Sequence, residues 1–545
     1  MPVRPSSSLF PVRSPHDAAR WRRFLLGCFL FVVGVRCFLV ERLGASIALV
    51  DEWEATGREV LSAWAHGTFS LAALFEAHNG DHRIVATRLW EIFWFTVNGA
   101  WDPKLVMIAK TVIFGAAATG FIHLLAGALD RTRFALGTLL AALFAFPFGY
   151  RNLLWAFQSQ FDFFLLTAAG ALCAVVAGRR WLALALAAAA PFTLGAGPVV
   201  AATLALVALL AGVFRLWPAR AAVGYGLVAL ALAAGGAALR AAHAAPLGPP
   251  GDQAFTLAKL LAWPYSNFLL IVAHLPETAR LVPGFVLRLP SAEQSLVLAA
   301  ARTLQAHPAL HVTLHVLLAL LLTTPLLLLA ARIARTRRLP SAAIGIVVVG
   351  LLALLLQGAS AVARSTEILV QTRFLDVVAL FGFTAMAAAV FLARSAPRLR
   401  RWLVLWAALI VPGYLATMGA TAIQLAHGKE REWVPAVRAF FPSRDLATLP
   451  ENTNWQLPIL ERDPTAFAAL LADPAMAAVL PRSILAPEEP PRPVARIVFA
   501  VARLGWLLAL AGTVLLATAT RAPRHCHVLR DTSRRRSPAE VSRIA

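Results

Sequence analysis

Two adjacent carboxylates, Asp51 and Glu52, lie directly after the first long apolar run of the sequence. Acidic residues are scarce, with 28 Asp and Glu among 545 residues, so a pair at this position is informative. Carboxylates at the edge of an apolar segment are costly to hold unless they are solvated or used. A carboxylate there can take a proton from a hydroxyl group as a general base. Asp51 and Glu52 are therefore candidate catalytic residues, the alternative being two solvated acids at a helix end.

A second polar cluster follows in the same loop. Residues 78–83 (HNGDHR) place two imidazoles, a carboxylate and a guanidinium within six residues. Such a set can bring an acid/base pair and a phosphate-binding cation within hydrogen-bond reach of one substrate. The alternative is a polar turn whose side chains satisfy one another. The candidate substrate-binding residues in this cluster are His78, Asp81, His82 and Arg83.

Two further arginines, Arg364 and Arg373, flank a polar stretch between two later apolar runs. By the topology derived below, this stretch lies on the side of the membrane that has few basic residues. A guanidinium at such a place can bind a phosphate group. The alternative is that these long side chains only reach lipid headgroups. Arg364 and Arg373 are also candidate substrate-binding residues.

Three histidines, His307, His311 and His315, recur every four residues at the start of another apolar run. On a helix they lie along one side, where an i, i+4 pair can chelate a metal ion. The alternative is simple packing at the membrane interface. A divalent metal ion is the one cofactor that these residues suggest.

The elements that must position these residues are membrane helices. The chain is 59% hydrophobic and 14% charged, against roughly 25% charged in a typical soluble domain. About 20 apolar residues of helix cross a ~30 Å hydrocarbon core, and the alternating pattern of a β-barrel is absent. The sequence predicts an all-α integral membrane protein with about 12 transmembrane helices, at residues 24–40, 105–127, 134–149, 161–178, 182–197, 198–214, 221–239, 308–331, 341–357, 374–394, 402–424 and 496–519.

The arginines predict how these helices are oriented. The net charge of +22 is concentrated in short basic clusters between apolar runs, which is typical of cytoplasmic loops. A multi-pass protein of the plasma (inner) membrane with both termini in the cytoplasm follows. The positive charge thus reflects topology and contact with membrane lipids, and it does not indicate nucleic-acid binding.

This topology divides the chain into five parts. A basic cytoplasmic N-terminus (1–23) precedes a polytopic core (24–424), whose first extracytoplasmic loop spans 41–104; within that loop, residues 55–76 have the pattern of an amphipathic interfacial helix. A small extracytoplasmic segment (425–495), the last transmembrane helix (496–519) and a basic cytoplasmic tail (520–545) follow. Residues 256–275 are apolar enough for a thirteenth span, but a crossing there would turn the arginines at 332–338 outward. We interpret 256–275 as re-entrant or interfacial, in keeping with Pro264 in its middle.

Many membrane helices, a cytoplasmic N-terminus and an acidic motif in the first outer loop resemble the GT-C superfamily of membrane glycosyltransferases. The match covers this architecture and the short motif Asp51-Glu52. The stretch from Asn152 to Gln158 (NLLWAFQ) is also similar to a segment of bacterial membrane proteins of this general type.

The resemblance implies a transferase that takes a sugar from a polyprenyl-phosphate carrier and passes it to a glycan, lipid or protein acceptor of the cell envelope. It implies that Asp51, with Glu52 beside it, is the base or a metal ligand. An inverting displacement would release polyprenyl phosphate, whose charge needs cations; Arg83, Arg364 and Arg373 are candidates.

Two other classes of function remain open. One is a transporter or lipid-linked-sugar flippase without transferase activity, although the predicted span interiors are almost free of the carboxylates that ion-coupled carriers need. The other is a non-catalytic subunit of an envelope-assembly complex. Neither inverted repeats nor polar residues for a midplane cavity are apparent in the sequence.

Overall fold

The structure is a computed structural model in which almost every described residue is helical or lies in a short connection between helices. It describes residues 14–49, 51–78, 82–130, 132–241, 249–266, 299, 302–304, 306–364, 372–426, 435, 438–439, 469, 471–480 and 490–521. Within these ranges the one β-type pairing is an isolated bridge between His78 and His82. The predicted all-α class is therefore confirmed for the described chain.

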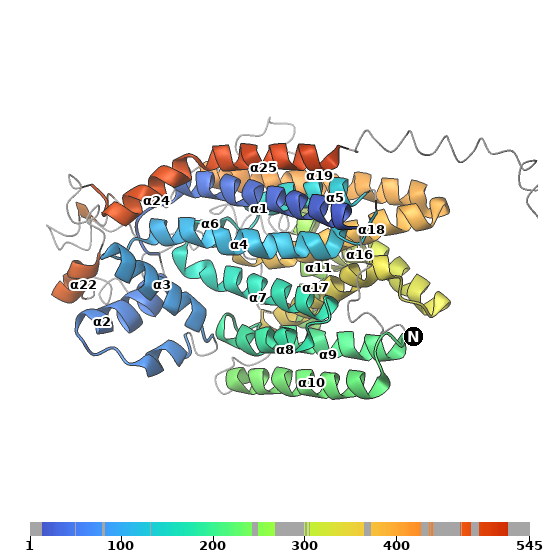
Figure 1. Ribbon diagram of the computed structural model, residues 1–545, viewed down its shortest axis with the longest axis horizontal. Helices are drawn as coiled ribbons and strands as arrows, with labels where there is room; N and C mark the ends of the chain where they lie inside the picture. The colour runs from blue at the N-terminus through green and yellow to red at the C-terminus, as the bar shows by residue number, and fades with distance from the viewer. Residues whose placement is uncertain are drawn as a thin grey trace, which may run out of the picture.

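Long apolar helices run side by side and form the body of the molecule (Figure 1). Among the described residues, eight helices are long and apolar enough to cross a membrane, and a bent pair adds a ninth. The eight candidate spans correspond to the helices α1 (Pro15–Leu43), α4 (Pro103–Ala126), α7 (Ser159–Val176), α10 (Ala219–Ala241), α16 (Pro308–Thr336), α17 (Ile344–Ala363), α18 (Leu375–Ser395) and α19 (Arg400–Ala426). Some of these spans also include a short helical turn at one end.

The remaining predicted spans coincide with shorter or bent helices. These are α5 (Arg133–Ala145), α8 (Arg180–Ala189), α9 (Pro198–Val213) and the pair α24 (Pro493–Arg503) and α25 (Gly505–Thr520), which is bent by 45°. Each of the twelve predicted spans thus has a helix at its position. That all twelve cross the membrane stays a prediction, because α5, α8 and α9 have 10 to 16 residues, or about 15–24 Å of helix.

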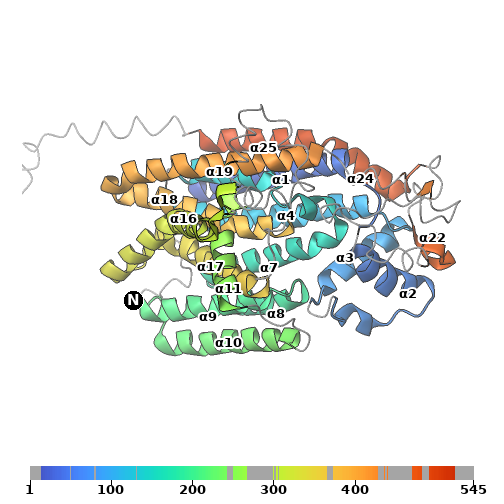
Figure 2. The ribbon, with the colours of Figure 1, turned by 180° about the vertical axis from the view of Figure 1, so that it is seen from behind.

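Helices α1 and α25, from opposite ends of the chain, pack along their length (Figures 1 and 2). Glycines make this approach close. A Cβ on Gly505 would lie 2.6 Å from the Gly34 carbonyl oxygen, and one on Gly512 would lie 2.7 Å from that of Gly27. Small residues at a membrane-helix interface let backbones approach and gain van der Waals contact where no hydrophobic driving force exists.

Short elements gather at one end of the bundle, here called the loop end, where α1 finishes and α4 begins (Figure 1). They are the π-helix η1 (Trp53–Ser62), α2 (Ala63–Ala65), the 3-10 turn η2 (Leu71–Phe75), α3 (Val85–Asn98) and α22 (Pro474–Val479). The α22 segment contacts the first loop, since Trp101 donates its backbone N–H to the carbonyl of Val479, at 2.7 Å. The loop end therefore combines residues from the first loop with residues that precede the last helix.

The amphipathic helix predicted over residues 55–76 is shorter than expected. Helical structure ends at Ala65, and residues 71–75 form a separate turn. Gly67 has a φ of 68°, a left-handed conformation that ends a helix and that glycine adopts without steric cost. Val60 and Leu61 are buried, whereas Trp64, an apolar residue of the same predicted face, is exposed.

The ambiguous segment 256–275 overlaps α11 (Pro250–Leu261). This helix of 12 residues is about 18 Å long and too short to cross a ~30 Å core alone. It packs among α16, α17 and α18. Residues 267–275 lie outside the described ranges, as do most of 425–495 and the tail from 522, so those predictions stay untested.

The glycine seam predicts a matched pair of substitutions. Gly512→Ala should lower the free energy of unfolding by about 1–3 kcal/mol, because its methyl group would meet backbone atoms of α1. Gly235→Ala in α10, which has no atom within 4 Å of the added Cβ, should be neutral or slightly stabilising. Denaturation of both variants in detergent micelles measures the difference, and equal effects would contradict the seam.

Candidate active site

The centre of the candidate site is a contact between Asp51 and Arg373 at the loop end. Asp51 begins the turn that leads into η1, and Arg373 lies in the 3-10 turn η6 (Thr372–Phe374) directly before α18. Arg373 Nη1 is 3.9 Å from Asp51 Oδ2, and the two side chains are 23% and 12% exposed. Both groups therefore reach the surface, and the fold joins two loops that are far apart in the sequence.

Arg364, the other predicted cation of this loop, lies against the same turn. Its guanidinium carbon is 5.1 Å from the centroid of the Phe374 ring, and that of Arg373 is 5.2 Å from it. Such cation–π contacts hold a guanidinium in place. Arg364 and Arg373 are thus brought together on one aromatic ring, and Arg373 also lies beside Asp51.

The histidine cluster reaches this site only in part. His78 and His82 exchange backbone hydrogen bonds of 2.8 and 3.1 Å, and the His78 ring packs edge-on against Phe157 with centroids 5.2 Å apart. Burial lowers the pKa of His78 to about 4, although the nearby charges of Asp51 and Glu54 oppose this shift. His78 is therefore a neutral imidazole close to Asp51 at physiological pH.

Arg83 contacts a neighbouring turn of the first loop. The guanidinium of Arg83 donates a hydrogen bond to the carbonyl of Phe75 in η2. Asp81 lies outside the described residues. The proposed phosphate-binding cation therefore comes from the loop before α18, and Arg83 holds η2 instead.

The structure separates Glu52 from Asp51. Successive residues of a helix point about 100° apart, and Glu52 points inward, where its side chain is fully buried and receives no hydrogen bond from another side chain. Burial and the neighbouring Glu91 raise the pKa of Glu52 well above its usual value, against the effect of Lys110. A direct catalytic role for Glu52 is thus not supported by this arrangement, because no substrate can touch it here.

Beneath Asp51 lies a group of buried charges that the sequence analysis missed. Lys110 Nζ is 3.8 Å from Asp162 Oδ2, and Arg36 Nη2 is 3.3 Å from Asp376 Oδ1, with all four side chains almost inaccessible. Arg36 also stacks on Phe114, 3.3 Å from the ring centroid. Charges inside an apolar bundle are normally paired, and these two ion pairs connect α1, α4, α7 and α18.

Glu91 completes this group from α3. It is fully buried, and the indole of Trp101 lies beside its carboxyl group. Burial raises the pKa of Glu91 to about 8, although the Trp101 indole and the charge of Lys110 oppose this shift. Glu91 is therefore largely protonated at neutral pH, which makes its burial next to Glu52 tolerable.

One signal in the sequence could have revealed this group. Arg36 and Lys110 lie inside predicted spans, and an ionisable residue inside a span marks a functional or structural site by default. The carboxylates Asp162 and Asp376 carry a weaker signal, because they lie near the starts of the predicted spans 161–178 and 374–394. Glu91 carries no such signal, because α3 lies outside every predicted span.

The histidines at the start of α16 (Pro308–Thr336) pack against one another and against an aromatic ring. His311 and His315 have ring centroids 4.7 Å apart, and Phe255 packs against both rings. The Nδ1 atom of His315 lies 3.0 Å from the carbonyl oxygen of His311. Across the described part of the chain, no three His, Cys, Asp or Glu residues come together as a set that could hold a metal ion.

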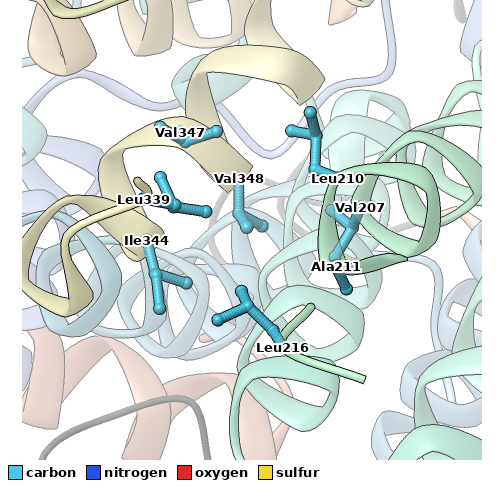
Figure 3. A pocket seen from close by; sticks show the side chains of 8 residues that line it. All are labelled: Val207, Leu210, Ala211, Leu216, Leu339, Ile344, Val347 and Val348. Atoms are coloured by element: carbon cyan, nitrogen blue, oxygen red, sulfur yellow. The ribbon is translucent and has the colours of Figure 1, made fainter. Parts of the chain in front are cut away.

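A small apolar pocket lies away from the loop end, between α9 and α17 (Figure 3). It offers about 10 Å³, near the lower limit for one water molecule. Aliphatic side chains alone line it: Val207, Leu210, Ala211, Leu216, Leu339, Ile344, Val347 and Val348. It has neither the volume nor the polar groups of a substrate site.

Comparisons of the chain with protein-family models, curated proteins and solved structures found no match.

The buried carboxyl of Glu91 predicts a pH dependence of stability. Its pKa of about 8 in the folded protein exceeds the value of about 4.3 for an unfolded chain. The unfolded state therefore loses its proton first, and stability should fall as the pH rises from about 4.5 to about 8. Glu91→Gln removes this loss, so the variant should be more stable than the wild type at pH 8, on the order of a few kcal/mol.

Thermal unfolding of detergent-solubilised protein between pH 5 and pH 8.5 tests this. The exposed Glu54 supplies the control, since Glu54→Gln should leave the pH profile unchanged. Parallel wild-type and Glu91→Gln profiles would show that Glu91 ionises at its ordinary pH in the folded protein.

Proposed function

We propose that this chain is a membrane glycosyltransferase of the GT-C type, which moves a sugar from a polyprenyl-phosphate donor to an envelope glycan, lipid or protein. The observation that carries the proposal is the partly exposed carboxylate of Asp51 beside the guanidinium of Arg373, with Arg364 packed on the same ring of Phe374 as Arg373. A base and a cationic phosphate site are the two groups that this transfer needs, and here they are adjacent. The resemblance of the sequence to the GT-C superfamily supports the same activity.

In the proposed reaction, Asp51 takes the proton of an acceptor hydroxyl group, and the hydroxyl oxygen attacks the anomeric carbon of the donor sugar. The bond between that carbon and the phosphate oxygen breaks with inversion, and polyprenyl phosphate leaves with the bonding electron pair. Its additional negative charge is stabilised by Arg364 and Arg373. Protonated Asp51 then returns its proton to water.

The ion pair between Asp51 and Arg373 is consistent with a site that has not yet bound its donor. Arginine binds carboxylate and phosphate through the same fork of N–H groups. A donor phosphate that binds Arg373 would weaken its hold on Asp51 and leave this carboxylate free to accept a proton. The contact of 3.9 Å is long for a hydrogen bond.

The surroundings of the site suit a lipid-borne substrate. Three large apolar side chains are exposed at the loop end: Trp64 on α2, and Leu71 and Phe75 on η2. Exposed apolar side chains next to a polar site are typical of elements at a membrane surface. We propose that the loop end faces the extracytoplasmic side, as the arginine distribution predicts, in the plasma (inner) membrane with both termini in the cytoplasm.

The first test is transfer of radiolabelled sugar into membranes from a panel of polyprenyl-phosphate donors. Asp51→Asn should reduce transfer by about 10²–10⁴-fold without changing expression, because the amide cannot accept the proton. Glu54→Gln, a nearby exposed carboxylate in η1, should retain activity. Full activity of Asp51→Asn would remove Asp51 from the mechanism. Absence of transfer by any of the three proteins, with lipid-linked sugar crossing vesicle membranes, would favour a flippase.

A second test concerns the cation. Arg373→Ala should raise the KM for the lipid-linked donor by about 10–100-fold, as expected for loss of a charge-assisted contact, and Arg373→Lys should recover only part of it because lysine lacks the fork. Arg58→Ala, which removes an exposed arginine of η1 that pairs with Glu54, is the control. An unchanged KM in Arg373→Ala would place the donor phosphate elsewhere.

A further inference from the structure

We propose that Asn152, itself held by Lys110, is a positioning residue that presents Arg373 to the donor phosphate. The proposal rests on the proposed function of Arg373 as a phosphate-binding residue. Asn152 belongs to the stretch between α5 and α7, far from both loops of the site in the sequence, and it touches no substrate.

The first link joins Asn152 to the turn that carries Arg373. Its side-chain Nδ2 donates to the backbone carbonyl of Arg373 at 2.6 Å and lies 3.1 Å from Asp376 Oδ2. Asn152 is buried, with 1% of its surface exposed. One amide therefore holds both the residue that presents the guanidinium and the first turn of α18.

The second link joins Lys110 to Asn152. The ammonium of Lys110 donates to the backbone carbonyls of Asn152 and Trp155 and faces Asp162. An ammonium has three N–H donors, and the two carbonyls take two of them, while the charge faces Asp162 at 3.8 Å. Lys110 thus fixes the backbone of the short helix α6 (Tyr150–Leu154). It thereby also fixes the direction of the Asn152 side chain.

Asp376 secures the same turn from the other side. Its carboxylate accepts from the backbone N–H of Gly149 at 3.3 Å and pairs with Arg36 at 3.3 Å. A Cβ at Gly149 would lie 2.5 Å from Asp376 Oδ2, so glycine is required for this approach. The backbone of Arg373 is therefore held rigidly, whereas its guanidinium remains partly exposed beside Asp51.

This arrangement suits positioning better than stabilisation alone. A buried lysine with carboxylates could be replaced by apolar residues with little loss of stability, yet here its donors are spent on the carbonyls of one short segment. An arginine that binds a phosphate must be held to well under 1 Å to keep its full effect. The chain from Lys110 through Asn152 to Arg373 supplies this restraint.

The test measures binding, so it does not require transferase activity. A water-dispersible polyprenyl monophosphate is titrated against the full-length protein in detergent, with phosphatidylglycerol as a competitor to distinguish the carrier phosphate from ordinary lipid headgroups. Asn152→Ala should weaken binding about tenfold, comparable to Arg373→Ala. The double variant should be no weaker than Arg373→Ala alone, because both changes act through one guanidinium.

Asn98→Ala is the matched control. Asn98 is another buried asparagine at the loop end, where it accepts from the backbone N–H of Ala495 at 3.1 Å, and it does not contact the Arg373 turn. Its replacement should lower stability without changing affinity. Asn152→Leu, which fills nearly the same space but lacks the Nδ2 donor, should also weaken binding about tenfold, and serves as a second variant if Asn152→Ala does not fold.

The outcomes separate the two proposals. Affinity that is unchanged in Asn152→Ala but lost in Arg373→Ala overturns the positioning role and leaves the proposed function standing. Additive losses in the double variant, or an equal loss in Asn98→Ala, also overturn it. If both Asn152→Ala and Arg373→Ala weaken binding while the wild-type protein transfers no sugar, the result supports positioning and contradicts the transferase. Wild-type protein that binds no polyprenyl monophosphate contradicts both.

Discussion

The arrangement of the loop end depends on charges that are buried inside an apolar helix bundle. The pairs Lys110–Asp162 and Arg36–Asp376 lie about 10 Å inside the ends of α1 and α4, where water and lipid headgroups do not reach them. A lone charge there would cost several kcal/mol, so each partner fixes the helix that carries the other. These pairs therefore determine how α1, α4, α7 and α18 meet, more strictly than apolar packing could.

The contact between Asp51 and Arg373 at the surface depends on these buried ion pairs. Helix packing in lipid relies on close contact and not on a hydrophobic driving force, and the glycine seam between α1 and α25 shows this on the opposite flank of α1. Polar contacts add direction to that packing. Through Asn152, the buried charges reach the backbone of Arg373, and through Arg373 they reach Asp51. Chemistry at the surface is thus linked to ion pairs in the interior.

The two adjacent carboxylates illustrate how burial assigns roles. Asp51 is accessible and pairs with a cation, whereas Glu52 faces Glu91 and the interior. Glu52 has its pKa raised by desolvation and by its carboxyl neighbour, and it is suited to remaining neutral within the fold. Of the pair, only Asp51 can meet a substrate, which gives the acidic motif one candidate base and one structural acid.

The sequence by itself determined the helical membrane architecture, because apolar length and arginine clusters depend only on local composition. It also indicated Asp51, Arg364 and Arg373 as candidate site residues, since charges are conspicuous in an apolar chain. Only the tertiary structure decided that Asp51 meets Arg373, that Glu52 is buried, and that Glu91 and Lys110 lie beneath them. Such pairings depend on which faces of distant helices oppose each other, and helix–helix register in a bundle is set by packing and desolvation across the whole fold.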